Sequence, residues 1–67
     1  KELSANGRGR DTKEALEEVR ENLDAQINEV ARLCVGGIRV SYGLQRCDPQ
    51  APVGQAFCFG LAHVHCN

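Results

Sequence analysis

The residues best suited to chemistry gather near the C-terminal end of this 67-residue chain, where cysteines and histidines alternate with apolar positions. The group consists of Cys58, His63, His65 and Cys66. All four are zinc-ligand types, and histidines two positions apart on a strand share a face. Structural zinc sites, however, usually combine two short Cys/His knuckles, and Cys34 and Cys47 lie far from this group. We therefore expect no metal and no other cofactor.

The same side chains could form a Cys–His catalytic pair. Such a pair needs a free thiolate, a base and an oxyanion site in a formed pocket. A chain this short buries only about 60% of the surface that its unfolded form exposes, so it has little core from which to build a pocket. An even number of cysteines in a small chain indicates disulfides instead. We predict a non-enzyme with no catalytic residue.

Four cysteines allow three pairings, and geometry ranks them. Cys58 and Cys66 would lie roughly 26 Å apart on a straight strand, whereas a disulfide needs Cα atoms within about 7 Å. We rank first the nested pairing, Cys34–Cys66 with Cys47–Cys58, and the other two pairings stay open. Disulfides persist in oxidising compartments, so we expect a secreted, extracellular protein.

A long helix should position the first of these cysteines. Asp11 can cap its N-terminus, with Glu14 completing a capping box, and the pair Gly36-Gly37 can end it. Apolar residues recur at the helical period at Leu16, Val19, Leu23, Ile27, Val30 and Cys34. The pattern predicts an amphipathic helix over about residues 12–35.

The other cysteines belong to a predicted β-segment. Residues 38–42 alternate with a period of two and predict a strand, and residues 45–54 contain two prolines and indicate a loop. The apolar run from Gln55 to His65 contains aromatic and branched residues and predicts a second strand. The fold class predicted is α+β: a long N-terminal amphipathic helix followed by a small disulfide-stapled antiparallel β-hairpin. Residues 1–10 show no apolar period and are interpreted as a flexible arm, which leaves residues 11–67 as a single domain.

The last predicted strand has two different faces. One face carries Phe57, Phe59, Leu61, His63 and His65, and the other carries Cys58, Gly60, Ala62, Val64 and Cys66. The small-residue face lets a helix approach closely, so we expect the helix there. The aromatic and imidazole side chains would then form a candidate partner-binding surface. Alternatively, the N-terminal arm or a second copy of the chain covers them.

Composition narrows the function classes. A net charge of −1 does not indicate a nucleic-acid partner, and no apolar stretch is long enough to span a membrane. The leading hypothesis is a small secreted protein of signal, toxin or effector type that binds an extracellular protein or receptor. The alternative is an oligomerisation module that self-associates through a coiled-coil helix and is cross-linked by its cysteines. The 3-4 seam of that coiled coil would consist of Leu16, Val19, Leu23, Gln26, Val30 and Leu33.

A third possibility comes from residues 33–37, Leu-Cys-Val-Gly-Gly, which follow an acidic helix. This segment resembles the end of a double-glycine leader of bacterial ribosomal peptides. The resemblance implies a peptide precursor that is cut after Gly37.

Overall fold

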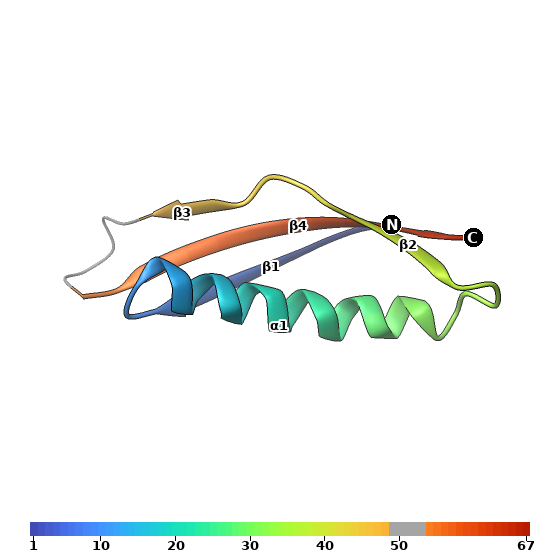
Figure 1. Cartoon of the computed structure of the whole chain (residues 1–67), viewed down its shortest axis with the longest axis horizontal. Coiled ribbons are helices and arrows are strands. Elements are labelled where there is room, and N and C mark those ends of the chain that lie inside the picture. The colour runs from blue at the N-terminus through green and yellow to red at the C-terminus, as the bar shows by residue number, and fades with distance from the viewer. Residues whose placement is uncertain (49–53) are drawn as a thin grey trace.

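A single helix packs on an antiparallel sheet in the computed structural model, which describes residues 1–48 and 54–67 (Figure 1). The elements follow in the order β1 (Glu2–Gly9), α1 (Thr12–Ala31), β2 (Ile38–Tyr42), β3 (Arg46–Asp48) and β4 (Ala56–Cys66). The α+β class is confirmed. The predicted N-terminal position of the helix is wrong, because β1 precedes it, and the predicted hairpin is part of a larger sheet.

Strand β4 is the centre of the sheet. Along one edge, β4 pairs with β1. Along its other edge, the C-terminal part of β4 pairs with β2 and the N-terminal part of β4 pairs with β3. Between Tyr42 and Arg46 the outer chain advances four residues, whereas β4 advances three from Ala62 to Phe59. The extra residue marks a β-bulge between β2 and β3.

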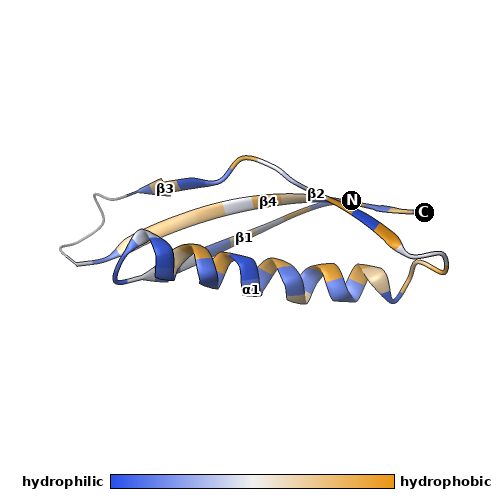
Figure 2. Ribbon diagram, in the orientation of Figure 1, coloured by the Kyte–Doolittle hydropathy of each residue, from blue (hydrophilic) through white to orange (hydrophobic). Residues whose placement is uncertain are grey.

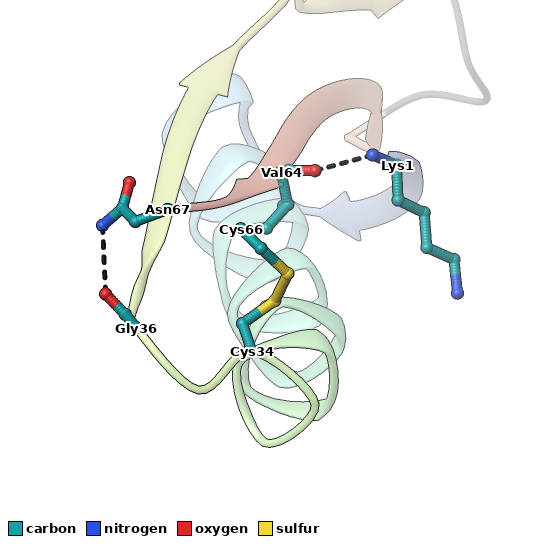
Figure 3. Close-up of a disulfide and its surroundings, with 6 residues drawn as sticks. All are labelled: Lys1, Cys34, Gly36, Val64, Cys66 and Asn67. Carbon is teal, nitrogen blue, oxygen red and sulfur yellow. Dashed lines mark hydrogen bonds between the residues drawn. A yellow bond between two sulfur atoms is a disulfide. The ribbon is translucent and has the colours of Figure 1, made fainter.

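Residues 1–10 are not a flexible arm, because residues 2–9 form β1. Leu3, Ala5 and Gly7 are buried, and the residues between them are exposed. Two glycines in this strand hide its period of two, since glycine has no side chain to register as apolar. Figure 3 shows that Lys1 extends the pairing: its backbone nitrogen donates to the carbonyl of Val64 at 2.6 Å.

Helix α1 begins where the sequence predicts and ends earlier. The Asp11 carboxylate accepts a hydrogen bond from the Glu14 amide at 2.8 Å, which caps the first turn. The helix ends at Ala31 rather than near residue 35. Cys34 leaves the helix and is buried in a disulfide with Cys66, so the chain turns before the glycines.

The core forms between α1 and the strands β1 and β4. The helix buries Ala15, Val19, Leu23 and Ile27, and Figure 2 shows its apolar side turned to the sheet and its polar side turned outward. Gly7 allows the close approach: a Cβ there would lie 2.7 Å from the backbone nitrogen of Val19. Small residues on the sheet thus set how near the helix packs.

Two disulfides tie the sheet together. Cys34–Cys66 joins the turn after α1 to the end of β4, with Cα atoms 5.3 Å apart (Figure 3). Cys47–Cys58 joins directly opposite positions of β3 and β4, with Cα atoms 4.0 Å apart. These are the pairs that the sequence argument ranks first. Strand β3 corrects the predicted loop over residues 45–54, of which residues 49–53 lie outside the described residues.

Candidate protein-binding surface

Strand β4 divides its side chains between two environments. Cys58 and Ala62 are fully buried under α1, together with Ala56, Gly60 and Val64. The expectation that the helix covers the small-residue face is confirmed. The opposite face carries the five predicted contact residues. His65 is exposed, and the other four are half-buried: Phe57, Phe59, Leu61 and His63. The structure thus places all five on one side of one strand, and α1 lies on the other.

Neighbouring strands add arginines around these side chains. Directly opposite residues of an antiparallel pair share a face, and the register sets Arg8 opposite Phe57, Arg46 opposite Phe59 and Arg39 opposite His65. The guanidinium carbon of Arg8 lies 5.6 Å from the centre of the Phe57 ring, within the range of a cation–π interaction.

We call this surface the aromatic face: the five β4 side chains with Arg8, Arg39 and Arg46. The sequence did not indicate Arg8 or Arg46 at this surface, because no strand was predicted over residues 2–9 or 46–48. A period of two through Leu3, Ala5 and Gly7 was the signal that could have revealed β1 and placed Arg8.

Charge differs between the two sides of the molecule. Helix α1 holds six acidic and two basic residues, a formal charge of −4. The aromatic face holds three arginines, and two acids share that side of the sheet, Glu2 opposite His63 and Asp48 opposite Phe57, a formal charge of +1. The acidic surface and the aromatic, basic surface therefore lie on opposite sides of the protein.

A groove opens beside the helix, because α1 packs on β1 and β4 rather than on β2 and β3. It has a volume of about 740 Å³ and lies between α1 and the bulge region. Its lining residues are Arg20, Leu23, Asp24, Tyr42, Gly43, Leu44 and Gln45. The sequence did not predict this groove, since it depends on the bulge and on the position of the helix over the sheet.

The structure changes how the cysteines and histidines can act. All four cysteines are in disulfides, so none offers a thiolate as a nucleophile. His63 and His65 lie on the side of β4 opposite Cys58. Across residues 1–48 and 54–67, no three His, Cys, Asp or Glu side chains are arranged to hold a metal ion.

The burial of α1 is relevant to the hypothesis of a coiled-coil oligomerisation module. Val19 and Leu23, which the coiled-coil seam would place against a partner helix, are fully buried on the chain's own sheet, whereas Leu33 is exposed. Gly37, after which the peptide-precursor hypothesis places a cut, has a φ of +91° and leads into β2. Its carbonyl accepts a hydrogen bond from the Asn67 amide at 3.0 Å.

In the part of the chain that the structure describes, no helix combines the length and the hydrophobicity that crossing a membrane requires.

Comparison with protein-family models, with curated proteins and with solved structures gives no match for this chain.

Proposed function

We propose that this protein is a small secreted, non-enzymatic protein that binds another extracellular protein through the aromatic face. The observation that carries the proposal is the side of β4 that faces away from α1, where Phe57, Phe59 and Leu61 stay partly exposed while the helix covers the other side. A contiguous apolar surface rimmed by polar residues is typical of protein-interaction sites. The two disulfides fit an extracellular or other oxidising environment.

The chemistry of the aromatic face indicates the kind of partner. Aromatic residues and arginine are enriched at interfaces and supply most of the binding energy where they are well packed. Two arginines beside two phenylalanines, Arg8 opposite Phe57 and Arg46 opposite Phe59, favour a partner that presents carboxylates beside apolar side chains. Such a partner would also be repelled by the acidic outer side of α1, which restricts it to the sheet.

Selection from a displayed random-peptide library tests the proposal without a known partner. We expect the folded protein to enrich sequences that combine Asp or Glu with aromatic or aliphatic residues. Two variants on the aromatic face, Phe59→Ala and Arg46→Glu, should each weaken the selected peptides about tenfold or more, which corresponds to about 1.4 kcal/mol.

Arg32→Glu is the matched charge reversal, because Arg32 is exposed after the end of α1, pairs with Glu29 and is not part of the aromatic face. It should leave binding unchanged, and circular dichroism should show that all three variants keep the fold. Peptides that bind equally well to wild type and Arg46→Glu, or a library that yields no common sequence, would refute the proposed function.

A further inference from the structure

The outer backbone groups differ in their hydrogen bonding between the two edges of the sheet. Along β1, side chains of α1 cover the outer carbonyls: Asn22 Nδ2 donates to Asn6 O at 2.8 Å, and Gln26 Nε2 donates to Ser4 O at 2.7 Å. Strand β2 pairs with β4 on one side, and no strand of the described chain lies beyond it. An edge strand with free backbone groups is a template for pairing with another chain.

The hydrogen bonds to β4 show which groups of β2 face outward. The amide of Gly43 donates to Leu61 O at 2.8 Å, and the Gly37 carbonyl accepts from Asn67 at 3.0 Å. Residues alternate along a strand, so the odd-numbered residues of β2 bond to β4. The N–H and C=O groups of Ile38, Val40 and Tyr42 therefore point away from the sheet.

Exposed apolar side chains gather around this same edge. The structure has four large, well-exposed hydrophobic residues among those it describes, and all lie between positions 33 and 44: Leu33, Val35, Tyr42 and Leu44. Two of them precede β2, and two stand at its end and in the bulge. Hydrophobic exposure that is concentrated on one edge indicates that something packs there.

We propose that β2 pairs with β2 of a second copy, antiparallel about a two-fold axis at Val40, to form one continuous sheet. In this register Val40 lies opposite its own copy and Ile38 lies opposite Tyr42 twice. Arg39 lies opposite Ser41 twice, so no like charges meet across the axis. A register with the axis one residue earlier, at position 39, would set Arg39 against Arg39, which is unfavourable.

The two-fold axis also brings opposite ends of β2 together. Antiparallel pairing brings the start of β2 in one copy beside the end of β2 in the other. The turn that carries Leu33 and Val35 thereby approaches Leu44 of the other copy, at the rim of the groove beside α1. Both copies make this contact, and it covers apolar surface that each chain alone leaves in water. The interface uses the backbone edge of β2, and of the aromatic face only Arg39 lies on that strand.

The test is to remove one outward-facing backbone donor without touching the monomer. A chemically synthesised chain with an N-methyl group on the Val40 amide loses the two central hydrogen bonds of the dimer and keeps every bond to β4. Sedimentation equilibrium should give wild type twice the 7.3 kDa chain mass at high concentration. The N-methyl-Val40 chain should dissociate with a dissociation constant at least about tenfold higher.

N-methylation of the Glu2 amide is the matched control, because this group also faces outward but on the β1 edge. It should leave the dimer intact, whereas Leu44→Asp, a change at an exposed site, should weaken it. Three results would overturn the proposal. The first is a wild type that does not exceed one chain mass at any concentration, which would leave the β2 edge to a strand of another protein. The second is a dimer that persists with N-methyl-Val40, and the third is a dimer that Phe59→Ala abolishes, which would place the contact on the aromatic face.

Discussion

Replacing Gly7 by alanine tests how closely α1 packs on β1. Gly7 is a buried residue in the middle of that strand, and its backbone faces the first turns of the helix. A Cβ atom there would lie 2.7 Å from the backbone nitrogen of Val19 and 2.9 Å from Val19 Cγ2. Backbone atoms cannot rotate away as a flexible side chain can, so the helix or the strand must move.

The cost follows from the size of that movement. Overpacking a tight core typically costs about 1–3 kcal/mol, and a clash with helix backbone belongs at the upper end, so we expect about 3 kcal/mol. A domain of 67 residues has a total stability of roughly 3–10 kcal/mol. Gly7→Ala should therefore remove at least about 30% of the folding free energy and lower the Tm by about 12–24 °C.

Thermal and urea unfolding followed by circular dichroism, with both disulfides intact, measures this change. Gly36→Ala is the matched control: it makes the same substitution where the nearest atom, Asn67 O, lies 3.4 Å from the new Cβ. The control should be neutral or slightly stabilising, because alanine restricts the unfolded chain. If Gly7→Ala unfolds within about 0.5 kcal/mol of the control, α1 does not lie against β1 as described.

Two further changes probe the same core. Deletion of residues 1–10 should abolish cooperative unfolding, because β1 contributes Leu3 and Ala5 to the core and covers one edge of β4. The sequence alone suggests that this deletion is harmless, and a Tm unchanged by the deletion would contradict the structure. Ile27→Ala should lower the free energy of unfolding by about 2–4 kcal/mol because Ile27 is buried. Gln26→Ala should lower it by about 1 kcal/mol, because the hydrogen bond to Ser4 is lost. Equal losses for the two variants in urea titrations would refute this assignment of helix faces.

Local features were predictable wherever one short segment carried its own signal. The capping carboxylate of Asp11 and the alternation over Ile38–Tyr42 gave the start of α1 and the bounds of β2. The division of β4 into a small-residue face and an aromatic face followed from period two alone. Each of these depends on neighbours in the sequence, which propensity and periodicity describe well.

Features that depend on distant partners were decided only by the tertiary structure. Strand β1 is a strand because β4, whose paired residues come 47 to 61 positions later in the chain, supplies its hydrogen bonds and α1 packs on its glycines. The early end of α1 accompanies the burial of Cys34 in its disulfide, and β3 forms beside a bulge that no local pattern marks. Glycine illustrates the reason: its sequence signal is a turn, yet at Gly7 a missing side chain is what lets helix and sheet meet.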